Sequence, residues 1–227
     1  SIEYVLRAGQ ITLDEVNLVG CGAWNGIDRS QVLPKLVDDI LELSQGLEAS
    51  GRKIISERIR ATIHADNIAK QQLSTDLLAY GIPKEKVINC DHHLSHALAA
   101  YYPSPFEDAV VLTADGRGDF RSLTIWEANR TSGLTLIDSG TELTSLGAMY
   151  GFVTNLLGFT PDRHEGKLTG LAAHGKKTEI YHYLKKGIYF CEQSGRIKTS
   201  IGEFYKPFVT AKLPTYEALL DRIAPED

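Results

Sequence analysis

The sequence predicts an α/β fold in which a mixed sheet carries helices on its faces. Two observations lead to this prediction. Stretches with helical apolar spacing alternate with short apolar runs, and later three short apolar runs follow one another with glycine-containing turns between them. The first pattern is typical of strands joined by helices, and the second of antiparallel hairpins. In chain order the expected elements are β-α-α-β-α-β-β-β-α-α.

The first half of the chain is expected to place two helices between two short strands. Pro34 fits the first turn of one helix, and Gly81 and Pro83 stop the other. The expected elements are the end of a helix over Ser1–Ala8, a strand over Val16–Cys21, a turn-rich loop over Gly22–Ile27, helices over Gln31–Leu47 and Ile59–Ala79, and a strand over Lys86–Cys90.

The second half is expected to hold a meander of three strands. Asp91 is a good N-cap for a helix that ends at Ala100, and Thr144 or Ser145 can cap a later one. Short turns between the strands make this part of the sheet antiparallel. The expected elements are strands over Ala109–Ala114, Ser122–Glu127 and Gly133–Ser139, a helix ending at Leu157, a loop over Pro161–Gly166, and helices over Lys167–Ala173, after Glu179 and over Thr215–Ile223.

Composition argues against several classes of protein. The 227 residues carry a formal net charge of -5 and no long run of Lys or Arg, so we expect no nucleic-acid partner. No apolar run is long enough to span a membrane. Cys21, Cys90 and Cys191 are odd in number and lack zinc-type spacing, which favours a reducing, cytoplasmic setting. We interpret Ser1 and Asp227 as the ends of an excised fragment.

Two histidines and an aspartate form the most specific candidate site. His92 and His96 are spaced so that both imidazoles lie on one face of a helix. Asp115 follows an apolar strand, at the edge where α/β proteins place ligands. Two imidazoles and a carboxylate make a metal set that leaves positions open for substrate. His93 points elsewhere on the helix and is open to two interpretations, a donor behind the ligands or a substrate contact.

Asp115 also begins a glycine-rich stretch in which Gly116 and Gly118 flank Arg117. Glycines let backbone N–H groups approach a phosphate closely, and Arg117 would add positive charge. The alternative is a tight turn with a solvated Arg117, because Asp-Gly is common in turns.

Two further segments are candidates for nucleotide contacts. Gly147 and Gly151 cost about 1 kcal/mol each inside a helix, which a close nucleotide or a neighbouring helix would explain. Gly166 and Lys167 stand at the start of a short helix, where the N-terminus attracts anions. The alternative for that segment is a small-residue helix packed against the sheet.

Four motifs occur in order along residues 1–175. They begin at His92, Asp115, Ser145 and Glu165, and read HHLSHA, DGRGD, SLG…Y…LGF and EGK…GLAA…G. Together they resemble the nodulation-type O-carbamoyltransferases, and the same core is similar to the TsaD-like enzymes that transfer threonylcarbamoyl to tRNA. The resemblance implies an actin/Hsp70-like (ASKHA) nucleotide-binding fold, with residues 1–227 as an incomplete N-terminal TsaD-like domain.

The resemblance also implies a mechanism. Carbamoyl phosphate and ATP would form carbamoyl-adenylate in a YrdC-like domain of the full chain. The TsaD-like domain would then move the carbamoyl group to a hydroxyl of a sugar, Nod-factor-like or antibiotic acceptor. A metal, Fe(II) or alternatively Mn or Zn, would bind His92, His96 and Asp115. The segments that would line the nucleotide are Gly116–Asp119, Gly147 and Gly166–Lys167. The general base stays unassigned, with His93 as a candidate.

The chain departs from the family pattern in several places. The first phosphate hairpin, a further aspartate ligand and the YrdC-like domain are expected outside these residues, so we expect the fragment alone to be inactive and to bind metal more weakly. Gly151 replaces an acidic residue of TsaD-like enzymes, which favours the O-carbamoyltransferase branch, and Asp119 stands where many relatives carry Glu. Two alternatives stay open: a tRNA threonylcarbamoyl-transfer protein and a noncatalytic nucleotide-binding module.

Overall fold

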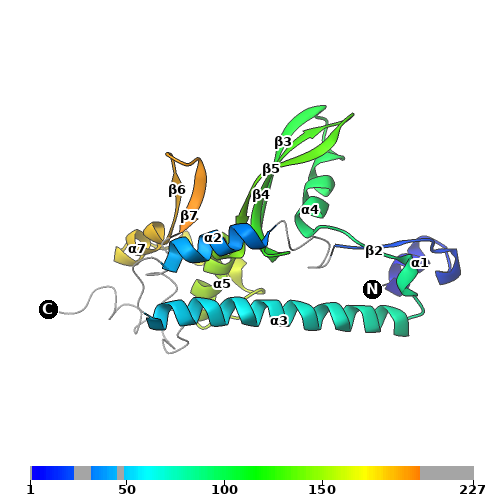
Figure 1. Cartoon of the computed structure of the whole chain (residues 1–227), viewed down its shortest axis with the longest axis horizontal. Coiled ribbons are helices and arrows are strands. Elements are labelled where there is room, and N and C mark those ends of the chain that lie inside the picture. Colours follow the sequence, from blue (N-terminus) through cyan, green and yellow to red (C-terminus); the bar gives the residue numbers. More distant parts are fainter. Residues whose placement is uncertain (1, 23–31, 45–48, 200–227) are drawn as a thin grey trace.

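The computed structural model describes residues 2–22, 32–44 and 49–199, and these residues form a mixed α/β structure (Figure 1). Their strands lie in three separate sheets. β1 (Val19–Cys21) pairs in parallel with β2 (Val87–Asn89). The next three strands form an antiparallel meander, β3 (Asp108–Gly118) to β5 (Gly133–Thr141), and β6 (Ile188–Cys191) pairs with β7 (Arg196–Thr199). The single mixed sheet expected from the sequence is therefore wrong for the described residues. A helix that packs on the meander follows β2 directly, and β2 pairs only with β1 among the described strands, outside the sheet of the meander.

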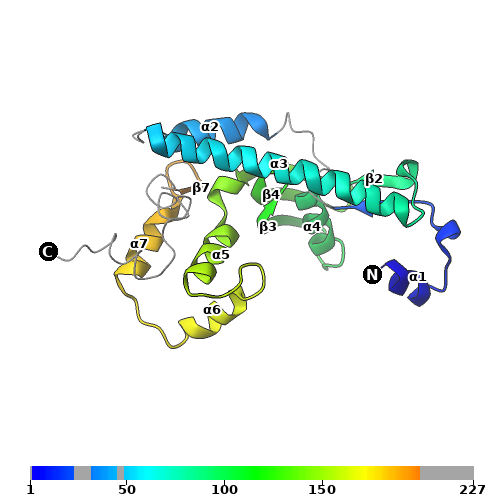
Figure 2. The same cartoon turned by 90° about the horizontal axis from the view of Figure 1, so that it is seen from below.

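Three α-helices lie among the described residues before β2: α1 (Ile2–Ala8), α2 (Leu33–Ser44) and α3 (Ala49–Ala79). α2 and α3 lie side by side, and Figure 2 shows α3 running along much of the molecule. α3 begins ten residues before the expected Ile59, since residues 49–58 have helix-forming side chains but no clear apolar stripe. Gly81, with a φ of 96°, follows its end as expected. Most of the loop expected over Gly22–Ile27 falls outside the described residues.

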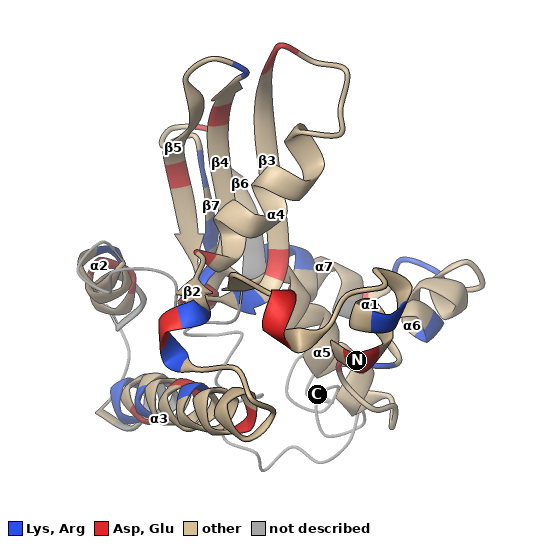
Figure 3. Ribbon diagram, turned by 90° about the vertical axis from the view of Figure 1, so that its right-hand side faces the viewer, with Lys and Arg blue, Asp and Glu red and all other residues tan. Residues whose placement is uncertain are grey.

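Helix α4 (His92–Tyr101) begins where the sequence predicts. Asp91 is its N-cap, and the Asp91 Oδ1 accepts a hydrogen bond from the Leu94 N–H at 2.8 Å. The helix packs on one face of the meander (Figure 3). There Ala97 and Tyr101 form a core with three strand residues: Val111, Trp126 and Ala128. This packing fixes the helix that carries the paired histidines.

The meander consists of β3 (Asp108–Gly118), β4 (Arg121–Asn129) and β5 (Gly133–Thr141), antiparallel as predicted. Gly118 pairs with Arg121, so the connecting turn is formed by Asp119 and Phe120, with φ of 50° and 61°. Of the link expected over Gly116–Asp119, only Asp119 lies in the turn, because Gly116, Arg117 and Gly118 belong to β3. The register shifts between Ala114 and Gly118, which makes this segment a bulge.

The remaining elements follow the meander. Ser145, and not Thr144, caps the next helix, because its Oγ accepts from the Ala148 N–H at 2.9 Å. The elements are α5 (Leu146–Leu156), α6 (Glu165–Ala172), α7 (Glu179–Gly187), β6 (Ile188–Cys191) and β7 (Arg196–Thr199). The helix expected over Thr215–Ile223 falls outside the described residues. Within the described ranges, no helix is both long and apolar enough to cross a membrane.

Candidate metal centre

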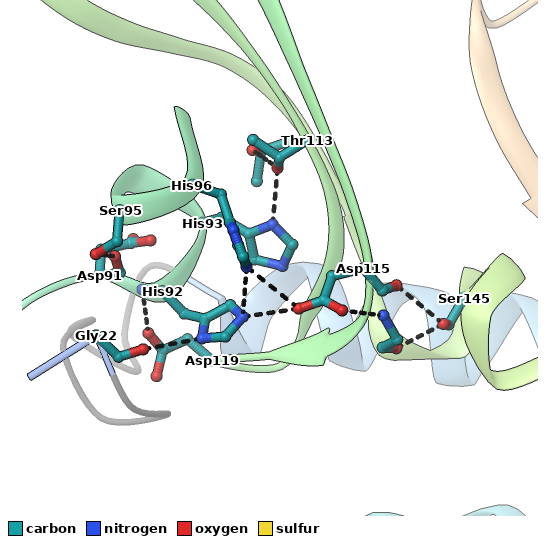
Figure 4. Close-up of polar contacts among 12 residues, drawn as sticks. Gly22, Asp91, His92, His93, Ser95, His96, Thr113, Asp115, Asp119 and Ser145 are labelled. Atoms are coloured by element: carbon teal, nitrogen blue, oxygen red, sulfur yellow. Dashed lines mark hydrogen bonds and ion pairs between the residues drawn. The ribbon is translucent and has the colours of Figure 1, made fainter. Parts of the chain in front are cut away.

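His92, His96 and Asp115 lie together, and we call them the His–His–Asp triad (Figure 4). The histidines come from the first turns of α4 and the aspartate from the bulge of β3. His92 Nε2 is 2.8 Å from Asp115 Oδ2 and 3.1 Å from His96 Nε2, and His96 Nε2 is 3.5 Å from Asp115 Oδ2. The three residues that the sequence singles out therefore point three ligand atoms at one place.

The hydrogen bond of His92 Nδ1 determines which ring nitrogen carries the proton in the neutral side chain. Nδ1 lies 2.9 Å from the carbonyl oxygen of Gly22, which can only accept a hydrogen bond. Nδ1 is therefore the donor, and a neutral His92 presents a lone pair at Nε2. Metal-binding histidines characteristically donate their second N–H to a carbonyl or carboxylate in this way.

The lone pair of a neutral His92 would face a carboxylate oxygen at 2.8 Å. Two acceptors at that distance repel each other unless a positive charge lies between or beside them. That charge can be the extra proton of an imidazolium, or a metal ion. The donor set therefore calls for a cation at the place where the three side chains meet.

The spacing also fits a metal ion. Ligands about 2.1 Å from a metal at adjacent corners of an octahedron lie about 3 Å from one another. The three separations in the triad, 2.8, 3.1 and 3.5 Å, bracket this value. Two histidines and a carboxylate on one face of an octahedron are typical of Fe(II) sites with open positions for substrate.

The carboxyl of Asp115 is held in its charged form. Burial raises its pKa, but the hydrogen bond that a protonated His92 donates, the one from the Gly116 N–H, and the charges of protonated His92 and His96 outweigh burial and bring the pKa below its usual value. Gly116 N–H donates to Asp115 Oδ1 at 2.6 Å, which leaves Oδ2 to face the histidines. A charged, oriented carboxylate is what a divalent metal requires.

His93 is not part of the triad. Its side chain is fully buried, and its Nδ1 lies 2.8 Å from Thr113 Oγ1. Thr113 Oγ1 is 2.6 Å from Thr124 Oγ1, and the Trp126 Nε1–H donates to Thr124 Oγ1 at 2.5 Å. Because Trp126 can only donate, the simplest complete arrangement passes one proton along each step and makes His93 Nδ1 the final acceptor. This placement favours a structural role for His93, and a contact with substrate stays a prediction.

The glycines near the triad make room for protein groups. A β-carbon on Gly118 would overlap the ring of His92, and one on Gly147 would lie 2.7 Å from the Gly116 Cα. The close neighbour of the helix glycine at 147 is thus a strand and not another helix, while the nucleotide contact expected from the sequence stays a prediction. Phosphate binding by Gly116, Gly118 and Gly147 stays a prediction. The close contacts give Gly118 and Gly147 a structural reason to be glycine, whereas a β-carbon on Gly116 would meet nothing within 4 Å.

Arg117 and Lys167 also contact protein groups. Arg117 Nη1 donates to Asp66 Oδ1 at 2.6 Å, and Lys167 Nζ lies 5.4 Å from the centre of the Phe159 ring. A β-carbon on Gly166 would have open space around it. Nucleotide contacts by these residues stay predictions, and the ion pair of Arg117 differs from the solvated alternative.

Sequence reasoning missed several residues that position the triad. The carbonyl of Gly22 carries no side-chain signal at all. Asp119 Oδ2 accepts from the His92 N–H at 2.9 Å, and Asp91 Oδ2 accepts from Arg121 Nη1 at 3.0 Å. Asp119 was recognisable, since aspartate tolerates a positive φ in a two-residue hairpin, but only once the turn is placed correctly.

Known proteins place this chain in a family. The family described as "Carbamoyltransferase N-terminus" matches residues 1–204. The nodulation protein NolNO of Sinorhizobium fredii is 39% identical over 205 residues, which is 83% of this chain and 26% of that protein. Two uncharacterized proteins also match: MJ1058 of Methanocaldococcus jannaschii, 38% identical over 43% of this chain and 18% of its own length, and sll1178 of Synechocystis, 36% identical over 38% of this chain and 14% of its own length.

The chain spans between 14% and 26% of the length of these relatives. The family match covers the whole region that contains α4, the meander and the triad. The chain belongs to the carbamoyltransferase family and matches the N-terminal region of its members.

Proposed function

We propose that this chain is part of an O-carbamoyltransferase and that the His–His–Asp triad is its metal centre. The carbamoyl group would come from carbamoyl-adenylate, made from carbamoyl phosphate and ATP by a YrdC-like domain of the full protein. The acceptor would be a hydroxyl of a sugar, Nod-factor-like or antibiotic molecule. The similarity to a protein named for nodulation supports the glycan branch of this proposal.

One observation carries the proposal more than any other. In a chain of the carbamoyltransferase family, the Nε2 of a histidine already hydrogen-bonded at Nδ1 faces a carboxylate oxygen at 2.8 Å, with a second imidazole at 3.1 Å. This set of donors suits a divalent metal with open positions, most simply Fe(II). When bound, such a metal would act as a Lewis acid that polarises the carbamoyl carbonyl or phosphate oxygen.

The chain's own residues would hold and orient this centre. Gly22 and Asp119 fix His92 through its Nδ1–H and its backbone N–H, and Gly116 fixes Asp115 through Oδ1. The acceptor oxygen would attack the carbamoyl carbon, the bond from that carbon to the AMP oxygen would break, and AMP would leave. The hydroxyl proton would pass to a base that is not assigned here, because buried His93 is poorly placed to reach an acceptor.

Two variants of the full-length protein test the proposal. His92→Ala and Asp115→Ala should each abolish carbamoyl transfer to an acceptor. ATP turnover that depends on carbamoyl phosphate should persist, because adenylate formation belongs to the other domain. Persistent transfer in both variants would disprove the role of the triad, and loss of both activities would point to unfolding.

A further inference from the structure

The bulge that carries Asp115 is tied to the middle of α3 by ion pairs. Arg117 Nη1 lies 2.6 Å from Asp66 Oδ1, and Arg117 Nε lies 3.7 Å from Glu142 Oε2. The side chains of Asp66 and Glu142 are 1% and 4% exposed, and that of Arg117 is 25% exposed. Two buried carboxylates from different parts of the fold thus converge on one guanidinium.

These ion pairs act close to the triad along the chain. Arg117 is two residues beyond Asp115, and both lie within the register shift between Ala114 and Gly118. A bulge redirects the side chains that it carries, so its backbone position decides where they point. Asp115 reaches α4 from this bulge, while Arg117 reaches α3 and the turn that contains Glu142.

Gly116, which lies between Asp115 and Arg117, is held by contacts of its own. Ser145 Oγ donates to the carbonyl oxygen of Gly116 at 2.5 Å, and the first turn of α5 lies so close that Gly147 has no room for a β-carbon. With Gly116 fixed by α5 and Arg117 fixed by α3, the backbone beyond Asp115 has two independent anchors. The direction of the Asp115 carboxylate then depends on both.

We propose that Arg117 and Asp66 are positioning residues for the His–His–Asp triad, which hold the bulge so that Asp115 Oδ2 stays at coordinating distance from the two histidines. This inference rests on the proposed metal role of the triad. The guanidinium is suited to the task because separate nitrogens reach separate carboxylates, which a single lysine ammonium does less well. Asp66 thereby influences a site whose ligands come from other elements.

Cobalt(II) titration of the full chain, followed by visible absorption, tests this proposal. Arg117→Lys keeps the positive charge but loses the separate nitrogen donors of the guanidinium. Asp66→Asn keeps the shape of the side chain but loses its negative charge. Arg130→Lys is the matched control, because Arg130 anchors the other end of the meander through the carbonyls of Tyr102, Ser104 and Phe106. Arg117→Lys and Asp66→Asn should each weaken cobalt binding about tenfold or more and alter the spectrum, as outer-shell changes do. Arg130→Lys should change neither.

The outcomes distinguish a failure of the positioning role from a failure of the proposed metal role of the triad. If Arg117→Lys and Asp66→Asn both bind cobalt like the wild type while His92→Ala does not, the positioning role is wrong and the metal centre stands. If His92→Ala also binds like the wild type, the metal centre itself is wrong. Hydrogen exchange of the Gly116 amide then tests the anchor alone: it should be faster in Arg117→Lys than in Arg130→Lys, and equal rates would overturn the anchor too. If Arg117→Lys fails to fold, Asp66→Asn decides alone.

Discussion

The imidazole of His92 occupies the space that a side chain at position 118 would need, so the His92 ring can keep its place only while residue 118 is glycine. A β-carbon on Gly118 would come within 2.6 Å of His92 Nε2, the atom that faces Asp115. The glycine in the bulged strand therefore serves the histidine directly.

Gly118→Ala should displace the His92 ring and weaken metal binding by about tenfold or more, because a shifted ligand no longer meets the other two. Gly116→Ala is the matched control within the same bulge. A β-carbon there meets nothing within 4 Å, and its backbone N–H to Asp115 is kept. Cobalt titration measures both variants. Equal affinities for the two would show that Gly118 is not needed for His92.

Gly147→Ala should destabilise the fold, by about 1–3 kcal/mol, because its β-carbon would press on the backbone of Gly116. Gly170→Ala provides the comparison, since Gly170 lies within α6 and a β-carbon there has open space. That control should be neutral or stabilise the fold by up to about 1 kcal/mol. Urea denaturation gives both values. An unchanged free energy of unfolding in Gly147→Ala would mean that α5 can move away freely.

Thr113→Val should break the buried hydrogen-bond chain between His93 and Trp126 and cost about 1–3 kcal/mol of stability. Cobalt affinity should change little, because these buried hydrogen bonds do not involve the ligand atoms of the triad. Thr135→Val, at an exposed position of β5, should cost much less. Thermal or urea unfolding distinguishes them. A large loss of metal affinity in Thr113→Val without loss of stability would give His93 a direct role instead.

His93 should also make the stability of the metal-free protein depend on pH. Burial lowers its pKa, against a smaller opposing effect of the Arg121 backbone. The unfolded chain takes up a proton near pH 6.5 and the folded chain only at lower pH, so stability falls as the pH drops below about 6.5. Urea denaturation between about pH 7.5 and 5.5 should show a smaller fall in His93→Gln than in the wild type. An equal fall would assign the effect to other groups.

The triad could be predicted from the sequence because each of its parts has a local cause. The spacing of His92 and His96 fixes their shared face once Asp91 caps the helix, and Asp115 follows directly on the apolar run of β3. The meander was also predictable, since apolar residues recur along its strands and turn residues separate them. Local patterns suffice where neighbours in sequence determine the geometry.

Contacts between distant segments could not be predicted in this way. Asp66 lies in a long helix without a clear apolar stripe, and nothing in its neighbourhood indicates that it binds Arg117. The same applies to Gly22, which acts through its backbone, and to Gly147, whose neighbour is a strand. The bulge itself was mistaken for a turn, because Asp-Gly favours turns and the register shift depends on the partner strand.

Metal content tests the central claim most directly. The full-length protein, its His92→Ala variant and its Asp115→Ala variant would be purified without oxygen and analysed for iron, manganese and zinc per chain. We expect one tightly bound divalent metal in the wild type, most simply iron, and its loss in both variants while their folds persist. A wild type without metal, or variants that retain as much as the wild type, would contradict the assignment of His92, His96 and Asp115 as the metal centre.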